Sequence, residues 1–560
     1  MTSVEPSFLT HLDGFLRRRS SFSTLVLGVA TIVPIGFVLY THEVWEDFFI
    51  TYRHSENLVR GHGLVYTSGE RVHGFTSVLN VLLPALFAWL TQARDFLLPL
   101  FLYRLVSLTG LLFALITVSS VVCDDQNPKR LQWFLCALFP LLAVLEIKTT
   151  AFAMNGQEAG LMLGFLAPTF VLAYRGWPRG DAWIGGICLA GLMYVRPDGF
   201  VYAAAIGVGG FAFCRQPRTP FLRSFARSIA IGFTLYLPWL IFTQVYYGSI
   251  IPHTIIAKQG TEYFQNATFG LVAPLVAGLA RLPERLCGTL TAIYDFQQPP
   301  TPASWPVWIH DAAFAFEGAA VSYWLIPTRD RLGRLASLCS LLFLCYLTYA
   351  SLIANSCPWY YPPLAFLSIL ALVRMSVTLP AYLSETVGAG VCILLVSALV
   401  LFLGFIFSYS LRALRLKQDV IDSGHRRFIG LWLKEHVADQ ETVYLEPLGY
   451  IGYFSQRKMR DWPGLVAPEV VAARRKIGHI PYPWGNYLWG KAAEEIKPDW
   501  IVARPLEVEQ MKASEALTRD YQLVKVFNAT EPIIAAGEFY GCAISYNDAV
   551  FEIFRRRQSP

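Results

Sequence analysis

The sequence has few charged residues for its length. Asp, Glu, Lys and Arg make up 15% of its 560 residues, whereas soluble domains usually carry about 25%. Hydrophobic residues make up 54%, which is more apolar side chain than one water-soluble core can bury. A lipid bilayer is the natural solvent for such a chain. The composition therefore predicts a polytopic α-helical membrane protein.

Other recognisable signals are also missing. The net charge of +6 is small for this length, so we expect no nucleic-acid partner. The ten cysteines form no Cys-x-x-Cys pair and no Cys/His cluster, so neither a zinc site nor a disulfide framework is expected. No Gly-rich nucleotide-binding motif is apparent. Most of the cysteines lie in or beside apolar segments, where they behave as small hydrophobic residues.

Long apolar runs are the dominant feature that the sequence does have, and about 20 such residues can cross a bilayer as a helix. The first run, from Phe22 to Tyr40, follows Arg17, Arg18 and Arg19 and lacks a small-residue cleavage site, so we expect an uncleaved signal anchor. We expect eleven spans, at residues 22–41, 101–123, 132–150, 158–174, 181–195, 199–214, 228–247, 307–327, 335–354, 359–378 and 387–409.

The apolar segment 78–92 could be a twelfth span or a helix at the outer surface. Cytoplasmic loops are rich in Lys and Arg. The basic clusters between spans fall inside, together with the three N-terminal arginines, only if 78–92 does not cross. We therefore expect a cytoplasmic N-terminus. The expected outer segments are 42–98, 151–158, 196–199, 248–306, 355–359 and 411–560.

Two domains are expected from this division. Residues 1–410 form the transmembrane domain with the outer loops 42–98 and 248–306. Residues 411–560 have mixed polarity, with short β-like runs at Glu441–Leu445 and Trp500–Val502, which is typical of a small soluble α/β domain.

Two adjacent carboxylates, Glu46 and Asp47, lie just beyond the first span. Adjacent residues do not share a helix face, so at most one of them readily points into a given site. A carboxylate beside Trp45, Phe48 and Phe49 can have a raised pKa and act as a general base. The alternative is a solvated acidic pair that caps an interfacial helix.

Further polar residues occur in the outer segments. His253 and Lys258 follow the seventh span, where a cation suits a lipid phosphate or simply snorkels to the surface. Arg196 and Asp198 belong to a tight Arg-Pro-Asp-Gly turn and could pair with each other. The remaining candidates for substrate binding are Arg53, Glu70, His73, Glu158 and Tyr360.

Several of these motifs occur in a characteristic order along the chain: Glu46–Arg53, Gly61–Ser77, Gly156–Glu158, Arg196–Gly199, Tyr247–Lys258, Thr442–Ser455 and Asp461–Leu465. Together they resemble the GT-C glycosyltransferases, in particular the mycobacterial terminal arabinofuranosyltransferases and related bacterial proteins. The chain departs from that pattern with Gln157-Glu158-Ala159 in place of Leu-Glu-Thr and with His253 in place of Asn. These departures leave the identity of the sugar open.

The resemblance implies an inverting transfer from a polyprenyl-phosphate sugar to a glycan, lipid or protein acceptor outside the membrane. It assigns the base to Asp47 and acceptor or metal positioning to Glu46. Lys258, with His253 and Arg196, is expected to bind the donor phosphate. A divalent metal is possible, and the sequence does not decide. A transporter or flippase of a lipid-linked sugar is the alternative, although transporters place ionisable residues near the bilayer midplane.

Overall fold

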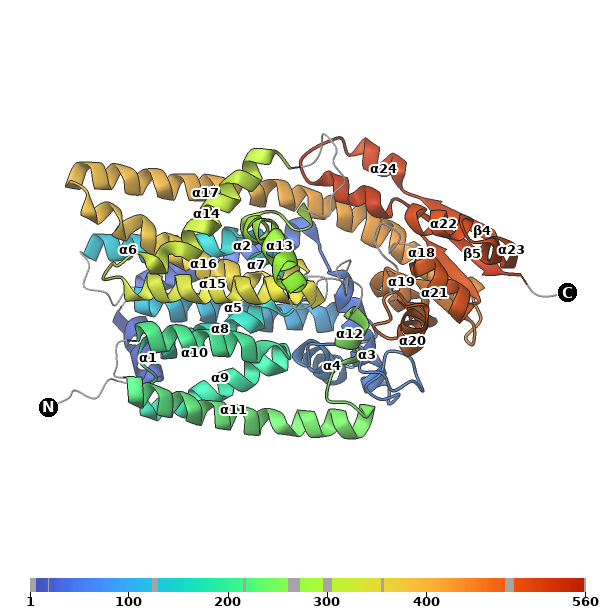
Figure 1. Cartoon of the computed structure of the whole chain (residues 1–560), viewed down its shortest axis with the longest axis horizontal. Coiled ribbons are helices and arrows are strands. Elements are labelled where there is room, and N and C mark those ends of the chain that lie inside the picture. Colours follow the sequence, from blue (N-terminus) through green and yellow to red (C-terminus); the bar gives the residue numbers. More distant parts are fainter. Residues whose placement is uncertain are drawn as a thin grey trace.

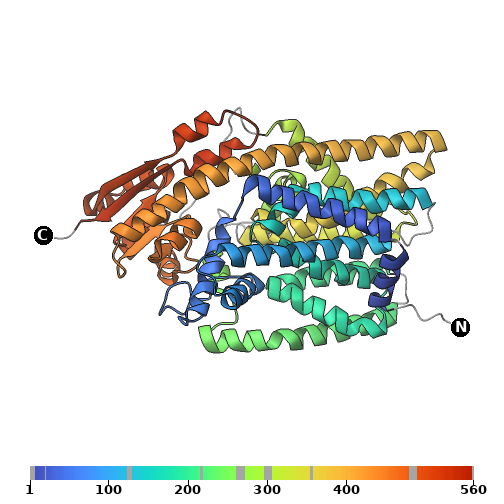
Figure 2. The same ribbon diagram turned by 180° about the vertical axis from the view of Figure 1, so that it is seen from behind.

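The computed structural model describes residues 7–18, 20–122, 129–214, 218–259, 272–295, 305–353, 357–478 and 488–557. Most of these residues form a helical bundle, and a small mixed sheet follows near the C-terminus. Figures 1 and 2 show the longest helices running in the same general direction, with the sheet at one end of the bundle and the N-terminal helix at the other.

The bundle begins with two helices and a sharp bend. Helix α2 turns by 90° into α3. The helices up to the seventh predicted span are α1 (Phe8–Arg18), α2 (Ser20–Thr41), α3 (Glu46–Val59), α4 (Leu79–Thr91), α5 (Leu97–Val122), α6 (Lys129–Leu145), α7 (Ile147–Met154), α8 (Ala159–Tyr174), η1 (Arg179–Asp181), α9 (Ala182–Val195), α10 (Gly199–Phe213) and α11 (Arg218–Tyr247).

The second half of the bundle contains α12 (His253–Lys258), α13 (Val272–Leu290), α14 (Val307–Ser322), η4 (Tyr323–Leu325), α15 (Arg331–Ile353), η5 (Pro358–Tyr360), α16 (Pro362–Thr378), η6 (Pro380–Tyr382) and α17 (Glu385–Leu416). Helix α17 continues through a π-helical stretch, η7 (Lys417–Arg426), into α18 (Arg427–His436). The predicted domain boundary at residue 410 therefore lies inside one continuous helix.

Each of the eleven predicted spans overlaps a helix. Among the described residues, four helices are long and apolar enough to cross a membrane, or up to six if each bent pair counts as one span. The count of eleven spans therefore stays a prediction. Segment 78–92 forms α4, which lies beside α3 at the end of the bundle that carries the C-terminal domain (Figure 1).

The predicted span 132–150 is not one straight helix. It breaks between α6 and α7 with a bend of 71°, where the Glu146 carboxylate accepts the backbone N–H groups of Lys148 at 3.1 Å and Thr149 at 2.7 Å. An N-cap of this kind starts a new helix. Glu146 and Lys148 are both buried, so this break places two charged side chains inside the bundle.

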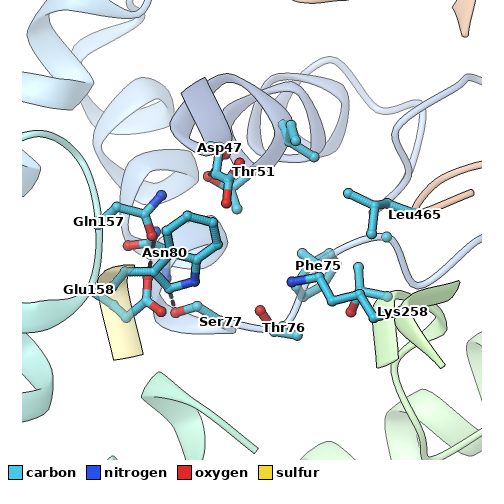
Figure 3. Close-up of a pocket in the computed structure, with 14 residues that line it drawn as sticks. Asp47, Thr51, Phe75, Thr76, Ser77, Asn80, Gln157, Glu158, Lys258 and Leu465 are labelled. Atoms are coloured by element: carbon cyan, nitrogen blue, oxygen red, sulfur yellow. Dashed lines mark hydrogen bonds between the residues drawn. The ribbon is translucent and has the colours of Figure 1, made fainter. Parts of the chain in front are cut away.

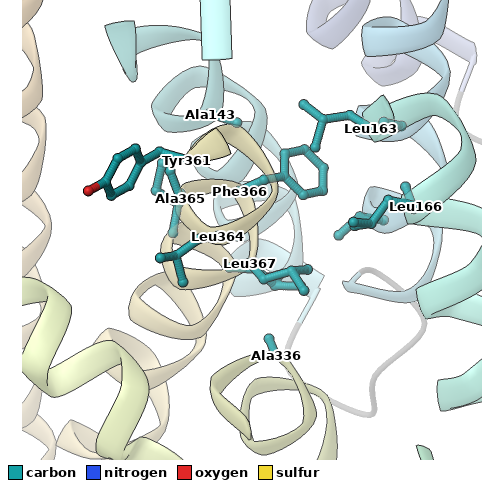
Figure 4. Packing of buried hydrophobic residues seen from close by; sticks show 14 of the residues in the cluster. Ala143, Leu163, Leu166, Ala336, Tyr361, Leu364, Ala365, Phe366 and Leu367 are labelled. Carbon is teal, nitrogen blue, oxygen red and sulfur yellow. The ribbon is translucent and has the colours of Figure 1, made fainter. Parts of the chain in front are cut away.

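Close packing of apolar side chains holds the bundle together. Phe139 of α6 meets Phe366 of α16 edge to face, with ring centroids 5.1 Å apart, and Figure 4 shows Phe366 beside Leu163. Helices α5 and α8 approach so closely that a Cβ on Gly160 would lie 2.2 Å from the Ser107 carbonyl oxygen. Small residues commonly permit such contacts between membrane helices.

The C-terminal domain is built on a five-stranded sheet of order β2-β1-β3-β5-β4. Strand β1 pairs in parallel with β2 and β3, and β5 pairs antiparallel with β3 and β4. This confirms the expected α/β character, including strands at both predicted runs. The elements are β1 (Thr442–Leu445), α19 (Leu448–Ser455), β2 (Lys458–Asp461), α20 (Pro468–Ile477), α21 (Leu488–Ile496), β3 (Trp500–Ala503), α22 (Pro505–Lys512), α23 (Glu515–Asp520), β4 (Tyr521–Asn528), α24 (Thr530–Ala535), η9 (Cys542–Asp548) and β5 (Val550–Arg556).

Candidate active site

The bend between α2 and α3 places two carboxylates at the end of the bundle that carries the C-terminal domain. Trp45 precedes α3, is buried, and donates its backbone N–H to the Asn155 carbonyl at 2.8 Å. Its ring stacks on Tyr294 with centroids 5.3 Å apart. The first turn of α3 then presents Glu46 and Asp47 in different directions, as expected for adjacent helical residues.

A small pocket lies beside Asp47, and residues from seven parts of the chain line it. They are Asp47, Ile50 and Thr51 of α3, Gly74–Ser77, Asn80 of α4, Gln157 and Glu158, Thr254 and Lys258 of α12, Trp359, and Leu465 of the C-terminal domain. Figure 3 shows Asp47 and Lys258 extending from different sides toward the same space.

The Asp47 carboxyl is suited to accepting a proton. In the described part of the chain its carboxylate has no hydrogen-bond or ion-pair partner. Burial raises its pKa from 3.8 to about 7, and the charges of Glu46 and Glu158 also raise it, whereas Lys258 lowers it. A general base works best when its pKa lies near the operating pH. Asp47 therefore has the surroundings of a base, as its apolar neighbours in the sequence predict.

Lys258 supplies a positive charge to the same pocket. Its Nζ lies 5.8 Å from the centroid of the Trp359 ring. Burial lowers the pKa of its ammonium group, but Tyr360, Cys357 and Asp47 outweigh burial and hold the pKa above its ordinary value. Lys258 is therefore a cation at neutral pH, facing a space large enough for ligand atoms to enter.

Glu46 has a different environment from Asp47. Its carboxylate accepts from Arg426 at 2.5 Å and from the backbone N–H of Gly449 at 3.2 Å. Arg426 is buried and also pairs with Asp422 and Asp548. Glu46 thus fastens the start of α3 to the C-terminal domain rather than lining the pocket.

Arg196 lies in a closed ionic cluster at the edge of the pocket. It pairs with Glu158 at 2.9 Å and with Asp198 at 2.9 Å. Its guanidinium carbon lies 4.0 Å from the centroid of the Tyr360 ring, and Tyr346 donates to Asp198 at 2.6 Å. The expected pairing of Arg196 with Asp198 is present. Of this cluster only Glu158 lines the pocket. Arg196 therefore acts on the pocket through its ion pair with Glu158.

His73 and His253, the two histidines among the sequence candidates, join the first loop to the start of α12. His73 is buried and stacks on Tyr247 with centroids 4.7 Å apart, and burial lowers its pKa to about 3. The backbone N–H of His253 donates to the His73 carbonyl at 3.0 Å. Both residues therefore hold the start of α12 against the first loop, and neither lines the pocket.

Arg53 and Glu70 instead contact the C-terminal domain. Arg53 donates to the carbonyls of Gly452 at 2.7 Å and Arg457 at 2.9 Å. Glu70 accepts two hydrogen bonds from Arg460, each 3.1 Å long. These contacts give both residues a docking role in this structure.

Some pocket residues were not among the sequence candidates: Thr51, Thr76, Ser77, Asn80, Gln157, Thr254, Trp359 and Leu465. Asn80 left a signal, because it is a polar residue in an otherwise apolar segment. It donates to Glu158 at 3.4 Å and accepts from the Tyr103 hydroxyl. Leu465 belongs to the Asp461–Leu465 motif, but only the tertiary fold brings it to the pocket.

The described residues offer no cluster of metal ligands at this site. Within the described ranges, no group of three or more His, Cys, Asp or Glu side chains could hold a metal ion. Glu46 and Asp47 therefore form no such group with a third described side chain.

Comparison with solved structures identifies the fold. An archaeal oligosaccharyltransferase, AglB from Archaeoglobus fulgidus, aligns with 91% of this chain and 73% of its own at a TM-score of 0.53 and 14% identity. ArnT from Cupriavidus metallidurans aligns with 96% of this chain and 98% of its own at a TM-score of 0.50 and 10% identity. The chain has the same fold as these two proteins, the GT-C fold. It is thus a multi-span membrane protein.

Sequence comparison adds two matches. A terminal beta-(1->2)-arabinofuranosyltransferase from Mycobacterium tuberculosis is 25% identical over 258 residues, which cover 41% of this chain and 39% of that relative. The match therefore spans well under half of the relative. A family described as a domain of unknown function, DUF8728, matches residues 418–552, which include strands β1 to β4 and the start of β5.

Proposed function

We propose that this chain is an inverting glycosyltransferase that moves a sugar from a polyprenyl-phosphate donor to an envelope acceptor outside the membrane. The observation that carries the proposal is the placement of Asp47 and Lys258 on one pocket. The matched ArnT structure holds undecaprenyl phosphate and the matched AglB structure holds a dolichol-phosphate. A donor of the same chemistry fits a pocket that contains a cation.

The proposed reaction is a single displacement. The acceptor hydroxyl oxygen attacks the anomeric carbon while its proton moves to the Asp47 carboxylate. The bond between the anomeric carbon and the phosphate oxygen breaks, and the electron pair leaves with the lipid phosphate. Lys258 stabilises the charge on that phosphate. One displacement inverts the anomeric configuration and needs no covalent sugar–enzyme intermediate.

Arabinofuranose is the first sugar to test, because the mycobacterial relative is an arabinofuranosyltransferase. The acceptor is proposed as a glycan, lipid or protein of the cell envelope. Glu158, with its partners Arg196 and Asp198, is proposed to orient the sugar from one side of the pocket. Arg53, Glu70 and His73 are proposed to act on the substrate only indirectly, through the segments that they fasten.

The proposed topology has the N-terminus in the cytoplasm and residues 411–560 on the outer side of a bacterial inner membrane. The N-terminal helix and the C-terminal domain lie at opposite ends of the bundle, which supports it (Figure 1). Reporter fusions after residues 127 and 420 test it. We expect a cytoplasmic signal at 127 and an extracytoplasmic signal at 420, and the reverse pattern would overturn the assignment.

A flippase for a lipid-linked sugar is the second candidate. The buried charges Glu146, Lys148 and Glu317 favour it, because transporters carry such groups inside the bundle. These charges have protein partners, however. Lys148 lies 3.5 Å from Glu146, and Ser368 donates to Glu317 at 2.8 Å. Internal pairing of this kind supports a structural role.

The test uses purified protein in lipid nanodiscs with synthetic polyprenyl-phosphate sugars, arabinofuranose first. We expect inverted glycoside product and release of polyprenyl phosphate. Mass spectrometry of envelope glycans from a deletion strain identifies the acceptor. Sugar transfer by protein in nanodiscs requires no second compartment, so it separates an enzyme from a flippase. Failure to transfer from every polyprenyl-phosphate sugar, with flipping in sealed vesicles, would reverse the choice.

A further inference from the structure

The helix that carries Lys258 is too short to fix its own position. Helix α12 contains six residues, from His253 to Lys258. Isolated helices shorter than about 12 residues are marginal in water. Contacts from elsewhere in the chain must therefore hold α12 and decide where Lys258 points.

Arg474 of α20 provides such a contact at the end of α12. Its guanidinium donates to the Ala257 carbonyl at 2.6 Å and to the Gln259 carbonyl at 3.0 Å. These two carbonyls flank Lys258 on both sides. Arg474 is 8% exposed, so its charged hydrogen bonds are shielded from water and strong.

The same guanidinium also holds the loop that brings Leu465 to the pocket. Arg474 donates to the Pro463 carbonyl at 2.8 Å and lies 5.2 Å from the centroid of the Trp462 ring. The loop is shaped from its other side by Asp461, whose carboxylate accepts the backbone N–H groups of Gly464, Leu465 and Val466 at 3.2, 2.6 and 2.9 Å.

We infer that Arg474 is a positioning residue that holds Lys258 and the Leu465 loop in register beside each other at the pocket. The C-terminal domain is then part of the active site, since it fixes the cation that binds the donor phosphate. This inference rests on the proposed function, in which Lys258 binds that phosphate. Arg474 itself does not line the pocket.

The test compares Arg474→Met with Arg475→Met. Arg475 is the next residue on α20 and is exposed. Its replacement removes the same charge but leaves the Arg474 hydrogen bonds to the Ala257 and Gln259 carbonyls in place. Binding of polyprenyl phosphate to the full-length protein in nanodiscs is the readout. Loss of one well-placed charged hydrogen bond costs about 1.5–3 kcal/mol, so we expect about 10- to 100-fold weaker binding for Arg474→Met and unchanged binding for Arg475→Met. Arg474→Lys should restore part of the affinity.

A double-mutant cycle separates positioning from general destabilisation. If Arg474 acts through Lys258, then Arg474→Met in a Lys258→Met background should cause little further loss of binding, because the interaction it supports is already gone. Additive losses would overturn the inference. Equal effects of the Arg474 and Arg475 changes would also overturn it.

Hydrogen exchange of the backbone amides in 253–259 gives a readout that needs no ligand. We expect faster exchange in Arg474→Met than in wild type and Arg475→Met, with unchanged exchange in α5. If wild type fails to bind polyprenyl phosphate, the proposed donor is wrong, whereas unchanged exchange of 253–259 refutes the clamp itself.

Discussion

The two sides of the first turn of α3 differ sharply although one peptide bond separates them. On one side, Glu46 joins a buried ionic network with Arg426, which links it to Asp422 and Asp548. On the other side, Asp47 borders a pocket that also contains Lys258. Burial raises the pKa of both carboxyls, but Arg426 opposes this rise as a direct ion-pair partner of Glu46, whereas the pKa of Asp47 rises to about 7.

This difference in partners suggests a structural role for Glu46 and a chemical role for Asp47, although both side chains end in a carboxylate. A carboxylate that already accepts charged hydrogen bonds is a poor proton acceptor, because protonation would break them. A partly buried carboxylate without such partners gains more from taking a proton. The comparison therefore assigns attachment of the C-terminal domain to Glu46 and the proposed base role to Asp47.

The largest expected effect concerns the base. Asp47→Asn keeps the side-chain shape and removes the proton acceptor, so the rate of sugar transfer should fall about 100- to 10,000-fold. Donor binding should survive. Glu46→Gln should lose less activity, because its side chain does not reach the pocket. Transfer assays on both purified variants measure this, and the opposite ranking would exchange the two roles.

The second effect concerns stability of the network. Arg426→Met leaves buried carboxylates without their partner, which typically costs about 3–5 kcal/mol. The neighbouring Arg427 is exposed, so Arg427→Met is the matched control. Unfolding followed in detergent should show a clear loss for Arg426→Met alone. Equal stability of the two variants would mean that the network does not hold the C-terminal domain to α3.

The third effect concerns the donor phosphate. Lys258→Met should weaken binding of polyprenyl phosphate about 10- to 100-fold, since a charged hydrogen bond contributes about 1.5–3 kcal/mol. Lys476→Met serves as the control, because Lys476 is 70% exposed on the C-terminal domain. Isothermal titration in nanodiscs measures both. Unchanged affinity for Lys258→Met would remove the assignment.

The smallest effect is a shift in the pH profile. Only the ionised Asp47 accepts a proton, so kcat/KM should fall about tenfold per pH unit below pH 7. The charge of Glu46 raises the pKa of Asp47. Glu46→Gln should therefore move the acid limb to lower pH, and a shift to higher pH would contradict the proposed coupling between the two carboxylates.

The raised pKa of Asp47 also predicts how the stability of the fold changes with pH. A carboxyl whose pKa is higher in the folded than in the unfolded protein destabilises the fold as pH rises from about 4 to 7. Asp47→Asn should therefore slightly raise the melting temperature at pH 7.5 and leave it unchanged at pH 4. A lower melting temperature at pH 7.5 would indicate that Asp47 has a structural role.

Sequence patterns predicted the helical membrane fold and the C-terminal α/β domain, and both are present. They did so because apolar runs and motif order are properties of consecutive residues. They did not predict the break at Glu146 or the continuous helix through residue 410. Both depend on local hydrogen bonding and on packing between distant segments, which hydropathy does not record.

The candidate site divides in the same way. The sequence by itself determined that Asp47 and Lys258 are charged groups beside apolar neighbours near the ends of spans. Only the tertiary structure decided that these two share a pocket and that Arg426 pairs with Glu46. It also decided that Leu465 lines the pocket and that Arg474 binds the backbone beside Lys258. The physical reason is that ion pairs and hydrogen bonds form between groups close in space, and folding brings together residues more than 400 positions apart, such as Asp47 and Leu465.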